Sequence, residues 1–153
     1  MTDAPSRLIL DEYLPYRLSV ASNRASGLIA RAYQARFGLT IWEWRVIAVL
    51  GEAAPLTAQG VCEATAMDKV TVSRAIRALD QRGLVQRRRQ AADRRASDVS
   101  LTEEGARIYE EIAPVALDHE RALLNGFSSE ERSQLMALLQ RLADRAARLG
   151  EPG

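Results

Sequence analysis

The sequence contains one cysteine, one histidine and few aromatic residues. These low counts exclude some kinds of site and favour one fold class. Cys62 is the only cysteine among 153 residues, so the chain cannot form an internal disulfide. His119 is the only histidine, which excludes a zinc site built from cysteine and histidine ligands. Aromatic residues make up 5% of the chain and apolar residues 47%, a balance that favours a mostly helical protein.

Long hydrophobic runs are also missing. No apolar run approaches the roughly 18–20 residues of a membrane span, and residues 1–6 lack the apolar segment of a secretory signal. We therefore expect a cytoplasmic protein with no membrane partner. The sequence has no nucleophile elbow, phosphate-binding glycine loop or metal-ligand cluster, so we expect no enzyme activity, no metal and no cofactor.

Charge is distributed unevenly along the chain. The net charge is +1, but residues 67–95 hold nine basic and three acidic residues, a net +6, which leaves −5 for the rest. A basic centre between acidic flanks indicates one face for a polyanion such as nucleic acid. The alternative is an arginine-rich face that is only solvated. The nine basic residues are Lys69, Arg74, Arg77, Arg82, Arg87, Arg88, Arg89, Arg94 and Arg95.

The first half of the chain shows helices with clear start and stop signals. Apolar residues recur every three or four positions from about residue 8 to residue 37, which predicts an amphipathic helix ended by Gly38. Pro15 makes its first turns doubtful. Thr40 and Glu43 fit a capping box for a short helix that runs to Gly51. A third helix of about eight residues follows Thr57.

The basic centre is predicted to form a helix-turn-helix with a wing. Asp68 is a suitable cap for a helix over residues 69–82, which Gly83 closes. Its apolar positions Val72, Ile76 and Leu79 share one face, and its polar and basic residues lie largely on the other sides. Residues 84–89 and 97–101 are predicted as two strands around the loop 90–96.

Two more helices are predicted after the wing, over residues 103–125 and 128–149. The fold class is therefore mainly α with a small two-stranded β-wing. We assign residues 39–102 to a winged helix-turn-helix DNA-binding domain, and residues 1–38 and 103–150 to a helical dimerisation region. A monomer that buries its own apolar stripes is the alternative. The stripe of the last helix consists of Leu135, Leu138, Leu139, Leu142, Ala146 and Leu149.

Two motifs of the predicted helix-turn-helix and wing resemble those of the MarR family of bacterial transcriptional regulators. One is the wing signature D-x-R-x-x-x-V-x-L-T-x-x-G, and the other is the run of residues 70–85, which contains most of the predicted helix 69–82. The resemblance covers nearly the whole chain. It implies an obligate homodimer that binds a pseudo-palindromic operator and is released by a small ligand, often an aromatic acid. The wing signature stands here as Asp93, Arg95, Val99, Leu101, Thr102 and Gly105.

The resemblance places the helix 69–82 in the major groove of double-stranded DNA. Arginine is the expected base reader, since its fork matches guanine O6 and N7. Lys69 and the strand arginines are better suited to phosphates, and Arg94 or Arg95 to the minor groove beside a loop held by Asp93. The predicted DNA-binding residues are Lys69, Thr71, Ser73, Arg74, Arg77, Arg87, Arg88, Arg89, Asp93, Arg94 and Arg95.

The effector prediction rests on an early cluster of aromatic, polar and cationic residues. We expect a small aromatic or anionic effector, such as an aromatic acid or its CoA thioester, and a repressor that it releases. The alternatives are tryptophans in the core with arginines at the surface, and a DNA-binding architectural protein or adaptor without an effector. The predicted ligand residues are Tyr16, Arg17, Ser19, Asn23, Ser26, Trp44 and Arg45.

Overall fold

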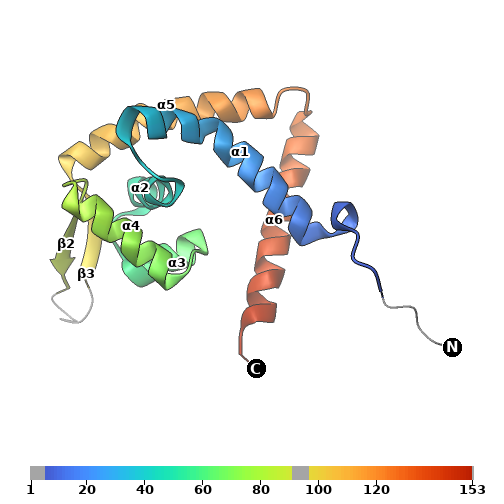
Figure 1. Ribbon diagram of the computed structural model, residues 1–153, viewed down its shortest axis with the longest axis horizontal. Coiled ribbons are helices and arrows are strands. Elements are labelled where there is room, and N and C mark those ends of the chain that lie inside the picture. Colours follow the sequence, from blue (N-terminus) through green and yellow to red (C-terminus); the bar gives the residue numbers. More distant parts are fainter. Residues whose placement is uncertain (1–5, 91–96, 153) are drawn as a thin grey trace. The chain divides into compact units, whose positions relative to one another are not determined.

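The computed structural model describes residues 6–90 and 97–152 and is mainly α-helical with a small antiparallel sheet (Figure 1). Within these residues, no helix is long and apolar enough to cross a membrane. The elements are, in chain order, η1 (Leu10–Glu12), α1 (Leu14–Phe37), α2 (Ile41–Ala53), β1 (Leu56–Thr57), α3 (Ala58–Thr65), α4 (Lys69–Gln81), β2 (Val85–Arg89), β3 (Ser97–Leu101), α5 (Glu103–Leu123) and α6 (Ser129–Gly150).

The helix boundaries follow the capping residues of the sequence. Pro15 lies in the first turn of α1, and Gly38 ends that helix in the left-handed conformation, as predicted. Ser128 and Glu131 form the complete capping box that begins α6. The box predicted for α2 is half formed: the Thr40 hydroxyl accepts from the Glu43 amide, but within the described residues the Glu43 side chain does not accept from the Thr40 amide.

The sheet has one strand more than the sequence predicts. Strand β1 pairs with β3 through Leu56 opposite Val99, so the order is β1-β3-β2 rather than a two-stranded wing. A strand of two residues is too short to show an alternating pattern, which is why the sequence did not reveal it. The extra strand attaches the wing to the start of α3.

One apolar core joins α2, α3, α4 and the sheet to parts of α1 and α5. The predicted face of α4 is buried in it, with Val72 and Leu79 fully inaccessible. Tyr33 of α1 and Ile108 and Ile112 of α5 belong to the same core. The chain accordingly divides into the compact units Met1–Leu117 and Asp118–Gly153, with the boundary inside α5. A dimerisation role for residues 1–38 and 103–150 stays a prediction.

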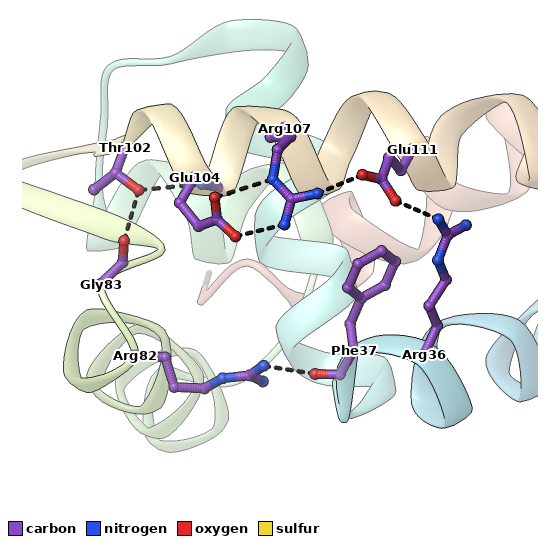
Figure 2. Close-up of polar contacts among 9 residues, drawn as sticks. Arg36, Phe37, Arg82, Gly83, Thr102, Glu104, Arg107 and Glu111 are labelled. Carbon is purple, nitrogen blue, oxygen red and sulfur yellow. Dashed lines mark hydrogen bonds and ion pairs between the residues drawn. The ribbon is translucent and has the colours of Figure 1, made fainter.

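The end of the wing signature has a packing role that the structure explains. Val99 is buried and Leu101 packs against the core from the same side of β3. The Thr102 hydroxyl donates to the Gly83 carbonyl at 2.7 Å and accepts from the Gly105 amide at 3.1 Å, which caps α5 (Figure 2). A Cβ on Gly105 would lie 2.0 Å from the Leu84 carbonyl oxygen, so only glycine fits there.

The end of α4 is held by α1 as well as by the start of α5. The Arg82 guanidinium donates to the carbonyl of Phe37 at 2.5 Å (Figure 2). It also donates to the carbonyl of Gly38 at 3.4 Å. These carbonyls lie at the C-terminal end of α1, where the helix dipole stabilises a positive charge. Arg82 therefore connects the helix of the predicted helix-turn-helix to a helix outside it.

An exposed row of charges connects α1 and α5 on the same side of the unit. Arg36 pairs with Glu111 at 2.7 Å, Glu111 also pairs with Arg107, and Arg107 pairs with Glu104 at 2.5 Å (Figure 2). Exposed ion pairs contribute little to stability one by one. Only the pair of Arg36 with Glu111 joins the two helices, whereas the pairs of Arg107 lie within α5.

Candidate nucleic-acid interface

Helix α4 divides cleanly into a buried apolar face and an exposed basic face. Lys69, Ser73, Arg74 and Arg77 are exposed, and Thr71 is half-buried. An exposed row of hydroxyl and guanidinium groups on a rigid helix matches the donors and acceptors at base edges and phosphates. The structure thus brings five of the predicted DNA-binding residues together on one element.

The start of α4 is fixed by Asp68, which leaves Thr71 with a structural bond as well. The Asp68 carboxylate accepts from the Thr71 amide at 2.8 Å and from the Thr71 hydroxyl at 2.7 Å. The backbone hydrogen bond from Thr71, followed by that of its hydroxyl, lowers the pKa of Asp68 below its ordinary value of 3.8. The hydroxyl proton of Thr71 is used in this cap, so toward DNA it offers an acceptor.

Replacing Asp68 with asparagine is expected to flatten the acid limb of the stability curve. A depressed carboxyl pKa contributes stability that is present above the unfolded-state pKa and is lost as pH falls through the folded-state pKa, here below 3.8. Asparagine still caps the helix but does not titrate. Thermal unfolding of both proteins between about pH 3 and 7 measures this. Parallel curves for D68N and the wild type would contradict the assignment.

The three arginines of β2 do not share one face. Arg87 and Arg89 alternate with Arg88, and Arg87 lies opposite the buried Val99. Arg87 therefore lies on the side of the sheet that faces α4, where it pairs with Asp80 at 3.7 Å. Arg88 lies opposite Asp98 on the other side. Only the Arg87 side is continuous with the exposed face of α4.

A hollow of about 420 Å³ lies between α3, α4 and the sheet. Its wall includes Ser73 and Arg77 of α4, Arg87 of β2 and Gln59 of α3. Two guanidinium groups, a hydroxyl and an amide around one hollow are suited to a phosphate of the nucleic-acid backbone. Sequence reasoning missed Gln59, because nothing in an eight-residue helix marks one polar residue as different from the others.

A second group of side chains lies between α1, α2 and α5. Trp44 stacks between two tyrosines, with ring centres 5.8 Å from Tyr33 and 6.3 Å from Tyr109. A Cβ on Gly51 would lie 2.6 Å from the Tyr109 ring, so this glycine makes room for the stack. Trp44 was predicted as a ligand residue, whereas Tyr109 was missed since 65 positions separate it from Trp44.

The Tyr33 hydroxyl at one end of this stack is buried without a protein partner. Tyr33 is 1% exposed, and its oxygen has no hydrogen bond within residues 6–90 and 97–152. Burial raises the pKa of Tyr33, while the charge of Arg45 opposes the rise. The Arg45 guanidinium lies 5.3 Å from the centre of the Trp42 ring. The Tyr33 hydroxyl is thus enclosed by protein at the end of the aromatic stack, within the influence of the Arg45 charge.

Comparison with known proteins decides the family. The profile described as MarR family matches residues 37–96. YwoH of Bacillus subtilis, described as an uncharacterized HTH-type transcriptional regulator, is 33% identical over 121 residues, which cover 77% of this chain and 88% of YwoH. The chain belongs to the MarR family. It is a DNA-binding transcriptional regulator of the winged-helix type, as the sequence predicted.

Solved structures of similar proteins agree with the fold. A MarR/EmrR family regulator from Acinetobacter sp. ADP1 has a TM-score of 0.84 at 28% identity, covering 92% of this chain and 99% of its own. BpsR of Bordetella bronchiseptica, whose DNA binding is regulated by 6-hydroxynicotinic acid, has a TM-score of 0.80 at 27% identity and covers 91% and 99%. The mainly helical fold class is therefore confirmed.

The remaining predicted site residues of this MarR-family regulator belong neither to α4 and β2 nor to the aromatic stack. Asp93, Arg94 and Arg95 fall outside the described residues, so the predicted minor-groove contact stays a prediction. The other predicted ligand residues lie on α1, exposed except for the half-buried Ser26. Tyr16 is about 25 Å along the helix axis from Tyr33, far from the aromatic stack in the same chain. These residues of α1 are Tyr16, Arg17, Ser19, Asn23 and Ser26.

Proposed function

We propose that this regulator is a repressor that binds a pseudo-palindromic operator as a homodimer and is released by a small aromatic acid. One observation carries the DNA-binding part: the exposed basic face of α4 lies opposite a fully buried apolar face. A helix anchored on one side can present fixed side chains to a groove on the other.

We assign different residues of this face to base edges and to backbone phosphates. Arg74 lies one helical turn after Val70, on the exposed side, and forms no ion pair with the described residues. It is our candidate for the bidentate guanine contact. Arg77 and Arg87 surround the hollow beside α3 and are assigned to the backbone, where they supply affinity and salt dependence.

The homodimer is supported by apolar side chains that the single chain leaves in solvent. On α6, Met136 is 68% and Leu138 57% exposed, and at the start of the chain Leu8 is 61% exposed. Apolar surface on this scale is typical of an interface rather than of a monomer. We assign a second copy of this chain as the partner that covers these side chains.

Replacing Leu138 with aspartate is expected to convert the dimer into monomers and to abolish tight operator binding. A charge at the centre of an apolar interface is costly to bury. Each monomer would then hold one half-site only. Sedimentation equilibrium and a mobility shift at the same protein concentration measure both effects. Ser133→Asp, on the opposite face of α6, is the matched control, and a dimeric L138D protein would refute the interface.

The effector site is proposed around the stack of Tyr33, Trp44 and Tyr109. The half-buried rings of Trp44 and Tyr109 supply an apolar surface, and Arg45 supplies the positive charge for a carboxylate. The Tyr33 hydroxyl, which is enclosed and has no protein partner in the described residues, lies at the end of the stack. The relative BpsR responds to 6-hydroxynicotinic acid, which is an aromatic acid. Helices α1 and α5 border the stack, and α1 and the cap of α5 also hold the end of α4. A ligand bound here can therefore change the position of α4.

A mobility-shift titration on the regulator's own promoter tests the proposal. The panel contains 6-hydroxynicotinic acid, a hydroxycinnamic acid, its CoA thioester and the uncharged amide of each acid. We expect one acid or thioester to release the DNA and the amides to be inactive. Arg45→Gln should weaken that response without weakening the shift in the absence of ligand. A shift that persists with every compound would favour the effector-independent alternative.

A further inference from the structure

Val70, near the start of α4, is an apolar side chain on a polar surface. It is 59% exposed. Of the described residues between positions 39 and 102, only Trp42 and Val70 are large apolar side chains left in solvent. The Arg45 guanidinium lies over the Trp42 ring, 5.3 Å from its centre. Val70 therefore stands out in the described part of the predicted DNA-binding domain.

Packing inside the chain does not explain a valine at position 70. Val72 lies on the buried face of α4, and residues two apart point about 200° away from each other around a helix. Val70 thus points away from the core. A β-branched residue at an exposed helix position also lowers helix propensity relative to alanine. A contact outside the chain is what would favour valine over alanine here.

The neighbours of Val70 are residues that we assign to DNA. Ser73 and Arg74 follow it by three and four positions, so they lie beside it on the same side of the helix. Together they form part of a hollow of about 300 Å³ on the exposed face. Its occupant has to bring anions for the cations and an apolar group for the valine. The hollow is lined by Lys69, Val70, Ser73, Arg74 and Arg77.

We propose that Val70 contacts the C5-methyl group of a thymine in the major groove of each operator half-site. Thymine presents a methyl group in that groove, and the phosphates beside it supply the anions. Valine in a helix keeps mostly one side-chain rotamer, so its methyl groups are fixed before binding and little entropy is lost on contact. The inference rests on the proposed function and names one base of the sequence that the regulator prefers.

The spacing along α4 relates this thymine to the guanine assigned to Arg74. Residues four apart are separated by about 6 Å along a helix axis, and successive base pairs by about 3.4 Å. We therefore expect the thymine and the guanine to lie within about two base pairs of each other. A hydrogen-bonding side chain would read thymine through O4, which uracil also carries, whereas the Val70 contact requires the methyl group.

Removing the methyl groups from the DNA tests the contact without altering base pairing. The regulator's own promoter region is amplified once with thymidine triphosphate and once with deoxyuridine triphosphate. Fluorescence anisotropy then measures the affinity of the wild type and of Val70→Ala for both duplexes. We expect uracil to weaken the wild type about tenfold more than it weakens V70A, because one buried methyl group contributes roughly three- to fourfold and a homodimer makes the contact twice.

Lys69→Ala is the matched control, on the adjacent residue that we assign to phosphates. It should weaken binding to both duplexes and leave the loss caused by uracil at the wild-type value. V70A should keep or raise the Tm of the wild type, because alanine favours the helix. Single uracil substitutions should confine the effect to one thymine in each half-site.

The outcomes separate this contact from the proposed function. Equal losses on uracil for the wild type and V70A, with tight binding to the promoter retained, would overturn the contact alone. So would a V70A protein with a changed oligomeric state and unchanged DNA affinity, which would place Val70 in a protein interface. A wild type that binds a scrambled duplex as tightly as the promoter would refute the proposed function, and the contact with it.

Discussion

Replacing Gly105 with alanine is expected to cost the winged unit about 3 kcal/mol or more of unfolding free energy. The new Cβ would lie 2.0 Å from the Leu84 carbonyl oxygen and 3.0 Å from its carbon, both backbone atoms. That carbonyl also accepts from the Thr102 amide at 3.1 Å, so it cannot move without breaking a hydrogen bond. Either α5 or the start of β2 has to shift.

The measurement is a pair of thermal unfolding curves at one protein concentration. A loss of this size corresponds to a decrease in Tm of about 6–12 °C for a chain of this length. Gly27→Ala is the matched control, because a Cβ at Gly27, inside α1, has no neighbour within 4 Å. That substitution is expected to be neutral or slightly stabilising, since alanine favours the helix. Equal Tm values for the two variants would show that α5 adapts freely.

Replacing Arg74 with alanine is expected to reduce operator affinity by about 30-fold or more and to relax the sequence preference. A bidentate guanine contact contributes about 1–3 kcal/mol, and a homodimer makes it twice. The loss should be confined to the operator, because non-specific binding depends on phosphates. Fluorescence anisotropy on the operator and on a scrambled duplex of equal length measures both quantities.

Arg77→Ala is the contrasting variant on the same helix. Its assignment to the hollow beside α3 and β2 predicts a similar loss on both duplexes and a salt slope smaller by about 1 for each phosphate contact removed. If R74A weakened both duplexes equally while R77A relaxed the sequence preference, the two roles would have to be exchanged.

Local signals in the sequence were sufficient for most elements. Asp68 and Ser128 are capping residues, and both begin helices where the sequence predicts them. The apolar spacing of α4 predicted the buried face correctly, which in turn defined the face that carries the DNA-binding candidates. These signals work because capping and periodicity depend only on residues within one turn or two.

Contacts between distant residues were not predictable in the same way. Strand β1 exists only because Leu56 meets Val99, 43 positions later. The stacking of Tyr109 on Trp44 and the bond from Arg82 to Phe37 likewise depend on how the helices pack. The buried Oε2 of Glu43 shows the limit most clearly, because the sequence presents Glu43 only as half of a capping box.

The way α4 is attached has a consequence for how operator preference diverges among related regulators. Arg82 and Gly83, which anchor the helix to α1 and Thr102, come after its last turn, whereas Ser73 and Arg74 lie earlier on its outer face. The outward residues can therefore be exchanged without disturbing the anchor. A gene duplicate can acquire a new set of target promoters in this way while the attachment of α4 to the rest of the fold is kept.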